Sequence, residues 1–474
     1  MMTRKFRRAR VAAAVGAAGF ALATGHALGA GFALQESNGS GVGNAYAGGA
    51  AAAEDASTIW SNPAGMSKLD RMQLVAGLDF VTPSFKFRDD GSVRASFQTL
   101  GGTGGDAGSV NYVPFAYFAV PINKQWSFGV GINAPFGLVT EYDSDWLGRF
   151  QGVKSDIKTI NVNPAVSWRI NDQFSLGVGV DWQKIDATFT SQVNYSAALA
   201  QAAGIAAAQG LIPASLVPTI IAATPNLQSF SDVNGDDSAW GWNIGVLWDI
   251  TPSTRVGAHY RSAIKYTISG NVSFDNPALP TLPPTLAPVV GLLANNVNAV
   301  LSNGGITAKV EVPDIVNVSM FSRIDPKWDI MGDVQWTRWS TIKDLTFVRT
   351  TGAVLSTTPE NFDDAWRISV GANYHYNDQW MFRGGFAWDQ TPVNNTDRTV
   401  RLPDEDRLWF SIGAQYKMNS NLKFDGGFTY IYANKADINQ SAGGITPIGY
   451  PSGLVKGNYD VSATIFALQM TYTF

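Results

Sequence analysis

The chain has no cysteine and only three histidines, one of which, His26, lies near the amino terminus. Disulfide and thiol chemistry are therefore excluded, and a multi-histidine metal site has too few ligands, so we expect no cofactor. Charged residues make up 15% of the chain, against roughly 25% in soluble domains. No later segment has the roughly eighteen uninterrupted apolar residues of a membrane-spanning helix, which excludes a helical membrane protein.

The amino terminus has the features of an export signal. A basic run precedes an Ala/Val/Gly-rich stretch over residues 11–24, and the small residues Ala27 and Gly29 stand just before Ala30. This order predicts a signal peptide over residues 1–29, cleaved near Gly29-Ala30. Cleavage removes five basic residues and leaves 474 − 29 = 445 residues with 29 basic and 38 acidic side chains, a net charge of −9. That charge argues against a nucleic-acid partner.

The carboxyl terminus alternates with a period of two. Large apolar side chains at Phe466, Leu468, Met470 and Tyr472 are separated by small or polar ones, and the chain ends on Phe474. Alternation of this kind places one set of side chains on each face of a strand. A final strand with aromatics at its end is typical of the closing strand of a bacterial outer-membrane β-barrel. Similar alternation recurs over 174–183, 240–248 and 380–389.

A repeated turn gives the number of strands. Short polar turns rich in Asn, Asp, Pro and Ser occur at 123–125, 171–173, 251–254, 325–327, 377–379 and 419–421. Consecutive turns are too far apart for one strand, so each interval must contain two strands joined by a longer loop. Six turns with both termini on the same side predict seven hairpins. We therefore expect an all-β fold, a 14-stranded antiparallel barrel over residues 70–474.

Residues 30–69 do not alternate, and a porin of this size needs no such segment. The simplest place for them is inside the lumen, as a plug. The motifs AGFALQ (30–35), GVGNAYAG (41–48), DAST (55–58), NPAGM (62–66) and APFGL (134–138) resemble those of the FadL-type outer-membrane transporters. The resemblance extends over essentially the whole mature chain. That family includes channels for long-chain fatty acids and for aromatic hydrocarbons.

The resemblance implies roles for particular residues. It makes residues 30–69 a hatch domain with Asn62, Pro63 and Ala64 as its signature, and Phe32 a residue that reaches back toward a lumen pocket. It also implies passive uptake of hydrophobic molecules, released sideways through a gap in the barrel wall. From the residues alone, ordinary packing within the plug explains Phe32 equally well.

The third predicted strand carries a break. The alternation places Trp126, Phe128 and Phe136 on one face, yet proline cannot donate to a strand ladder and is confined to edges and bulges. The residues of this kink are Gly131, Asn133, Ala134, Pro135, Phe136 and Gly137. An interrupted strand at membrane depth must border protein or a cavity. The alternative is that Pro135 merely ends the strand at the outer rim.

Two long loops, about 194–237 and 275–306, are unusually apolar. Large exposed apolar patches mark binding sites or interfaces, so we expect a groove that captures hydrophobic substrate. The alternative, compatible with the first, is that the loops pack on each other and cap the barrel. The residues of the predicted groove are Leu211, Ile212, Leu216, Val217, Ile220, Leu286, Val289, Val290, Leu292 and Leu293.

The sequence supports three other classes of function less well. An outer-membrane lipase or acyltransferase needs a Ser–His pair, but His259 and His375 both lie near predicted periplasmic turns. A general hydrophilic porin requires an open lumen, and a structural or adhesive barrel needs no plug. We expect no enzymatic activity.

The substrate is the main open question. A long-chain fatty acid needs a basic partner for its carboxylate, for which Arg261 and Arg383 are the candidates, whereas a toluene-like hydrocarbon does not. The remaining partners that we expect are outer-membrane lipid and lipopolysaccharide, around a monomeric protein.

Overall fold

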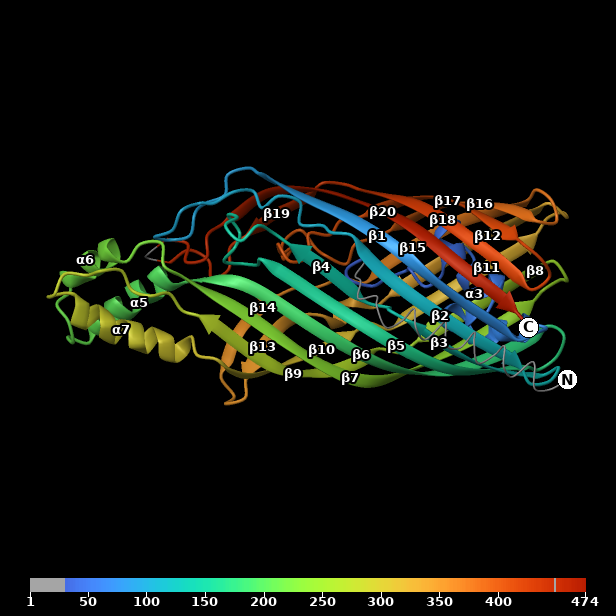
Figure 1. Ribbon diagram of the computed structural model, residues 1–474, viewed down its shortest axis with the longest axis horizontal. Helices are drawn as coiled ribbons and strands as arrows, with labels where there is room; N and C mark the ends of the chain where they lie inside the picture. The colour runs from blue at the N-terminus through green and yellow to red at the C-terminus, as the bar shows by residue number, and fades with distance from the viewer. Residues whose placement is uncertain (1–29, 447–448) are drawn as a thin grey trace.

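The computed structural model describes residues 30–446 and 449–474, so the predicted signal peptide lies outside the described residues. The chain forms one closed antiparallel barrel of 14 strands, in which β1 and β20 pair along their whole length and close the wall (Figure 1). The predicted fold class and strand number are thus confirmed. Within the described ranges, no helix is long and apolar enough to cross a bilayer.

Six of these strands are interrupted, which gives twenty labelled segments (14 + 6 = 20). The first ten segments are β1 (Gln73–Asp89), β2 (Asn111–Pro121), β3 (Trp126–Asn133), β4 (Gly137–Glu141), β5 (Lys154–Arg169), β6 (Phe174–Asn194), β7 (Gln228–Asp249), β8 (Thr254–Arg261), β9 (Ile264–Asp275) and β10 (Gly304–Val312). The others are β11 (Ile315–Arg323), β12 (Trp328–Thr337), β13 (Asp344–Arg349), β14 (Val354–Pro359), β15 (Ala365–His375), β16 (Trp380–Asp389), β17 (Arg407–Lys417), β18 (Leu422–Ala433), β19 (Ala436–Gln440) and β20 (Val455–Thr473).

All six predicted turns connect neighbouring strands, and they share one geometry. In five of them an Asn or Asp carboxamide or carboxylate oxygen accepts from the backbone N–H groups two and three residues later; at Asn123 these bonds are 2.8 and 2.9 Å. Thr251 does the same with its hydroxyl. The side chain thus replaces backbone pairing in the turn, which explains why the turns were readable from sequence.

Aromatic pairs line the rim at which these turns lie. Trp126 stacks on Trp168 across β3 and β5 with ring centroids 5.6 Å apart, and Phe174 stacks on Trp248 at 5.7 Å. Trp380 and Tyr416 form a similar cross-strand pair at 4.8 Å. Amphipathic rings favour the membrane interface, so this rim marks one boundary of the bilayer. The carboxyl terminus lies at the same end (Figure 1).

Residues 30–69 lie inside the barrel, where they form short helical turns that pack against strands around the wall (Figure 1). The turns are α2 (Gly39–Val42), α3 (Gly49–Ala52), α4 (Thr58–Ser61) and the 3-10 helix η1 (Pro63–Lys68). Inward-facing glycines make room for them: a β-carbon at Gly257 would lie 1.8 Å from the Ala50 carbonyl oxygen, and one at Gly245 1.9 Å from Asn62 Oδ1. Part of the high glycine content therefore reflects this close approach.

Asn62 ties this inner segment to the wall. Its Oδ1 accepts from the Ala64 N–H at 3.0 Å and caps η1, which begins with Pro63. Its Nδ2 donates to the carbonyls of Ala50 at 2.7 Å and of Val246, on β7, at 3.0 Å. One fully buried amide thus makes three hydrogen bonds to backbone groups, two within the inner segment and one to the wall.

Replacing Asn62 by Ala should loosen the segment without opening the barrel. Loss of the cap and of two buried hydrogen bonds should cost about 2–4 kcal/mol. We expect faster proteolytic cleavage within residues 30–69 of the purified protein, while the barrel keeps its strand content by circular dichroism. The control is Ser61→Ala, which leaves all three bonds in place. Equal cleavage of both variants would contradict this role for Asn62.

Candidate functional site

The third strand is interrupted between β3 and β4. Its register with β5 passes from Asn133↔Asn161 to Gly137↔Lys158, so three residues of this strand face two of β5. One extra residue is a β-bulge, which bends a strand and reverses the side-chain faces beyond it. Thr159 of β5 holds the bulge: its hydroxyl accepts from the Phe136 N–H at 2.9 Å and donates to the Phe136 carbonyl at 2.7 Å.

The bulge corrects one expectation. Uninterrupted alternation placed Phe136 on the same outward face as Trp126. The structure buries Phe136, at 3% exposure, on the lumen side. The extra residue shifts the alternation by one position, so the Phe136 ring turns inward. Ala134, which comes before the shift, stays in step with the outward positions of β3. The other kink residues, Gly131 and Asn133, end the regular part of β3.

Backbone pairing between neighbouring strands is incomplete beside this bulge. Strand β2 pairs with β1 from Asn111 onward, but with β3 only from Ala116↔Ile132 to Pro121↔Ser127. Residues 111–115 of β2 therefore have no strand partner on the side of β4 among the described pairings. Pro114 lies on this unpaired edge, as Pro135 lies in the bulge opposite. Proline is tolerated at such edges because it offers no N–H to leave unsatisfied.

The amino-terminal residues occupy the inner side of the gap. Leu34 donates its N–H to the Pro135 carbonyl at 2.8 Å, and Gly137 donates to the Phe32 carbonyl at 2.9 Å. Ala33 and Phe136 thereby form an antiparallel bridge. Farther along, the Glu141 N–H donates to the Ala107 carbonyl at 3.0 Å. A short piece of the inner segment thus pairs with the backbone of the interrupted strand where β2 does not.

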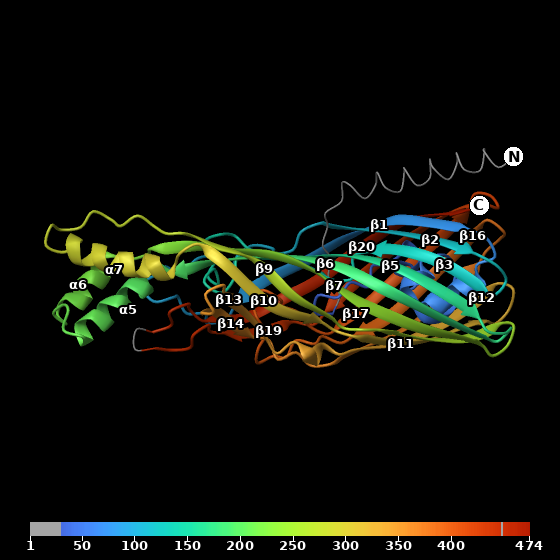
Figure 2. The same ribbon diagram turned by 90° about the horizontal axis from the view of Figure 1, so that it is seen from below.

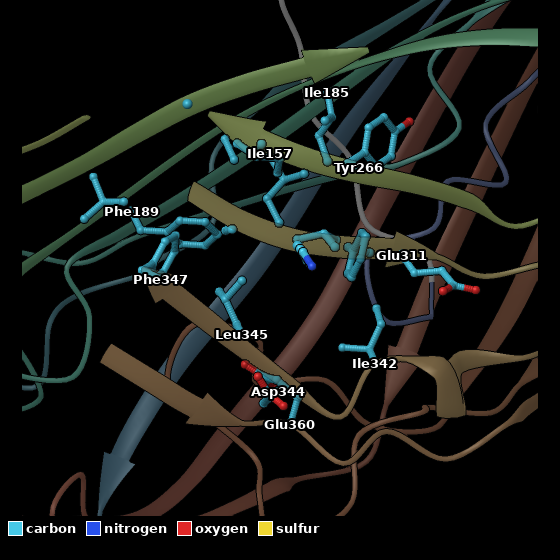
Figure 3. A pocket seen from close by; sticks show the side chains of 18 of the residues that line it. Ile157, Ile185, Phe189, Tyr266, Glu311, Ile342, Asp344, Leu345, Phe347 and Glu360 are labelled. Carbon is cyan, nitrogen blue, oxygen red and sulfur yellow. The ribbon is translucent and has the colours of Figure 1, made fainter. Parts of the chain in front are cut away.

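A cavity of about 450 Å³ lies inside the barrel, and Phe32 of the inner segment is one of its lining residues (Figure 3). Its volume is within the roughly 300–1,000 Å³ of small-molecule sites. Most of its walls are apolar side chains of β5, β6, β9, β10 and β13, among them Ile157, Ile185, Phe189, Tyr266, Ile306, Leu345 and Phe347. Phe32 lines it as well, packed on Trp339 at 4.9 Å and on Phe136 at 5.8 Å between ring centroids. The cavity thus borders the segment that pairs with the bulge.

Six acidic or basic side chains also line this cavity: Lys265, Lys309, Glu311, Asp344, Glu360 and Arg401. Glu360 lies in the break between β14 and β15, and Arg401 lies in the loop between β16 and β17. The Arg401 guanidinium donates to the Lys154 carbonyl at 2.8 Å and to Ser155 Oγ at 3.1 Å. Burial lowers the pKa of Arg401 to about 10, opposed by the nearby Glu360 carboxylate. Burial likewise raises the pKa of Glu360 to about 8. At neutral pH the Glu360 carboxyl therefore holds its proton, and Arg401 supplies a positive charge to a mainly apolar pocket.

The two arginines expected to meet a carboxylate are already paired. Arg261 forms an ion pair with Asp181 and lies over the Trp60 ring, 3.5 Å from its centroid. Arg383 bridges Glu54 at 2.8 Å and Asp425 at 3.0 Å. Neither lines the 450 Å³ cavity. Sequence reasoning missed Arg401 because it lies in an irregular loop, where no alternation indicates which side chains turn inward.

The two apolar loops form a helical lobe beyond one end of the barrel (Figure 2). It contains α5 (Tyr195–Ala208), α6 (Leu216–Ala223) and α7 (Ala287–Val300). Of the predicted groove residues, Ile220, Leu286, Val290 and Leu293 are buried between these helices, and Ile212, Leu216, Val217 and Val289 pack against that core. Leu211 and Leu292 remain 72% and 66% exposed. The packing alternative therefore accounts for most of these residues, and the apolar surface that is left is smaller than expected.

The boundary of the first of these loops also differs from the expectation. Strand β7 begins at Gln228, so the loop ends there and not near residue 237. Polar residues occupy both faces of 228–237, which hid the strand from an analysis based on apolar alternation.

The histidines do not form a catalytic pair with serine among the described residues. His375 Nε2 lies 2.7 Å from Asp329 Oδ2, near the rim with the short turns. His259 is buried on β8, and its Nε2 has no hydrogen-bond partner.

Comparisons with known proteins agree with this geometry. A family model described as outer membrane protein transport protein (OMPP1/FadL/TodX) matches residues 20–474. A long-chain fatty acid transport protein of Escherichia coli O6:H1 is 32% identical over 430 residues, which cover 89% of this chain and 91% of the relative. Outer membrane protein P1 of Haemophilus influenzae is 28% identical over 481 residues, 96% of this chain and 97% of the relative.

Solved structures show the same architecture. A Pseudomonas aeruginosa FadL homologue superposes with a TM-score of 0.81 at 25% identity, over 94% of this chain and all of that one. The Pseudomonas putida toluene transporter TodX superposes with a TM-score of 0.62 at 18% identity, over 88% and 94% of the two chains, a likeness of fold alone. The chain therefore belongs to the OMPP1/FadL/TodX family of outer-membrane transport proteins, which carry hydrophobic compounds.

Proposed function

We propose that the protein takes up long-chain fatty acids passively, holds them in the 450 Å³ cavity and releases them sideways into the bilayer through the gap beside Pro135. The observation that carries this proposal is the wall itself. Residues 111–115 of β2 have no strand partner beside the bulge among the described pairings, and the backbone of Phe32 and Leu34 bonds to the interrupted strand there. An unpaired wall backbone is costly in hydrocarbon, so a feature of this kind needs a function to explain it.

Capture begins at the helical lobe. The exposed Leu211 and Leu292 offer a weak apolar surface beyond the barrel. The lining of the cavity is more enclosed and supplies the tighter site. Burial of a methylene is worth roughly 0.8 kcal/mol, so a sixteen-carbon chain buried at once would gain ~12 kcal/mol and remain trapped. Transport needs graded sites that ligand can also leave, which a weak outer surface and a partly apolar cavity provide.

Residues 30–69 act as the hatch, with Asn62, Pro63 and Ala64 holding its base and Phe32 at its top. Phe32 borders the cavity, and the residues after it pair with the bulge. Withdrawal of residues 32–34 would open the cavity toward the gap. The few hydrogen bonds involved make this a small barrier compared with the whole plug. Release into lipid needs no energy source because the acyl chain prefers hydrocarbon to water.

Arg401 is the partner that we propose for the fatty-acid carboxylate. It lines the cavity and takes part in none of the described ion pairs, whereas Arg261 and Arg383 are neutralised by theirs. Relatives named long-chain fatty acid transport proteins support the same substrate class. A toluene-like hydrocarbon, as in the named toluene transporter of similar fold, remains the second candidate because the lining is mainly apolar.

We further propose that the protein works as a monomer surrounded by outer-membrane lipid and lipopolysaccharide. β1 and β20 pair with each other and close the barrel, so its first and last strands leave no sheet edge that would require a second copy. Lys158 and Lys184 lie two residues from the outward-facing Ile160 and Trp182, a position suited to anionic head groups of the outer leaflet.

The first prediction concerns the head group. Arg401→Met should weaken oleate binding about 10- to 100-fold, the value of a charge-assisted contact of roughly 1.5–3 kcal/mol, and leave toluene binding unchanged. Isothermal titration of the purified protein measures both. The control is Arg338→Met, which removes a half-exposed arginine paired with Asp314 outside the cavity. Equal oleate affinity of the parent and the Arg401 variant would contradict the assignment.

The second prediction concerns pH. Because burial raises the pKa of Glu360 to about 8, its carboxyl is neutral at pH 7 and becomes ionised as the pH rises toward 9. It then competes with the ligand for Arg401, so oleate affinity should fall about 10-fold between pH 7 and pH 9. Glu360→Gln should make the affinity nearly constant over this range. An unchanged pH profile in that variant would exclude Glu360 as the cause.

The third prediction tests the hatch. Ala33 and Phe136 are bridge partners, so their Cα atoms lie within the range that a disulfide spans. Because the chain has no native cysteine, the double variant Ala33→Cys/Phe136→Cys can form only one bond. Oxidation should reduce oleate uptake by cells at least 10-fold, and a reducing agent should restore it. Undiminished uptake with the disulfide formed would show that this segment does not have to move; each single variant serves as a control.

A further inference from the structure

A second cavity, of about 70 Å³, lies on the other side of the amino-terminal residues from the large one. Phe32 lines the large cavity, whereas Ala33, Leu34 and Gln35 line the small one. Pro135 lines the small cavity as well. Residues 32–35 therefore separate the two cavities. We call the cavity of 450 Å³ the upper chamber and the cavity of 70 Å³ the lower chamber; the lower chamber borders the bulge in the wall.

The lining of the lower chamber is mixed and somewhat more polar than that of the upper one. Its lining includes His259, Arg261, Asp333 and Arg367. Two of these four groups are internally satisfied: Arg261 pairs with Asp181, and Asp333 accepts from Asn317 at 3.0 Å and from Ser319. The other two are not.

Arg367 and His259 have unused hydrogen-bonding atoms. Arg367 is 2% exposed; it donates one Nη2–H to the Ala45 carbonyl at 2.8 Å and lies over the Trp409 ring, but its Nε has no partner. His259 is 6% exposed, and its Nε2 also has no partner. Buried polar groups are normally satisfied, so two such atoms around one cavity indicate a guest that accepts hydrogen bonds.

We propose that the lower chamber is a transit site for the carboxylate of a fatty acid, which rests there on Arg367 and His259 while the acyl chain passes through the gap. This inference rests on the proposed function and extends it. An ionised carboxylate moved into an apolar environment without partners is strongly destabilised. A polar chamber beside the exit removes that cost at the step where the acyl chain has left the upper cavity.

The size of the chamber fits this use. At about 70 Å³ against about 450 Å³, the lower chamber is roughly one sixth the size of the upper cavity, so a head group fits it better than a whole acyl chain. The upper chamber thus selects the acyl chain, and the lower chamber receives only the head group.

The test compares two cargoes with the same tail, oleate and oleyl alcohol. His259→Leu and Arg367→Met should each slow oleate uptake by cells about 5- to 10-fold and leave oleyl alcohol uptake unchanged. Oleate affinity of the purified protein, set by the upper cavity, should stay within 2-fold of the parent value. His259→Gln keeps a hydrogen-bonding side chain and should retain most of the oleate uptake.

The control is His375→Leu, which removes the histidine paired with Asp329 away from this chamber. Outer-membrane levels and heat-modifiable migration establish that each variant folds, and His259→Gln serves if His259→Leu does not. Equal slowing of both cargoes, or no slowing of either, would overturn the inference. Failure of the parent protein to take up oleate would instead count against the proposed function itself.

Discussion

The structure depends on one constraint: at membrane depth, every backbone N–H and C=O group must find a partner within the protein. A closed barrel meets this requirement everywhere except where a strand is broken. Here the third strand contains one extra residue, and β2 diverges from it. The inner segment supplies the missing partners through Phe32 and Leu34, and Thr159 holds Phe136 from the other side. The plug and the break therefore belong to one arrangement.

The distribution of charge inside the lumen follows the same logic. Around the inner segment, most buried ions are matched, as in the pairs of Arg383 with Glu54 and Asp425. Those pairs fix the base of the plug and leave no charge to attract a ligand. Arg401 at the upper chamber and Arg367 at the lower one take part in none of the ion pairs described above, although Arg367 lies near the carboxyl groups of Glu36, Asp333 and Asp389.

Much of this architecture was predictable from the sequence because local rules dominate it. Asn and Asp side chains at the turns hydrogen-bond to the nearby backbone, so the turns can be recognised in the sequence and their spacing gives the strand number. Pro135 indicated the break because a proline removes a ladder donor. Pro114, on the other edge of the gap, carried the same signal and was overlooked. The inward turn of Phe136 was not predictable, since the extra residue becomes evident only when the partner strand is known. Arg401 and Arg367 gain their roles from distant packing that no local pattern records.

The central claim is that cargo leaves through the interrupted wall. Deleting Pro135 removes the one extra residue and should bring β3 and β4 into a single register with β5, because Gly137↔Lys158 would then continue the pairing that ends at Asn133↔Asn161. The measurement is oleate uptake by cells producing this variant, alongside oleate binding to the purified protein. We predict that binding is retained and that uptake falls to the level of cells without the protein. Uptake at the parent rate through a wall shown to be continuous would contradict the account.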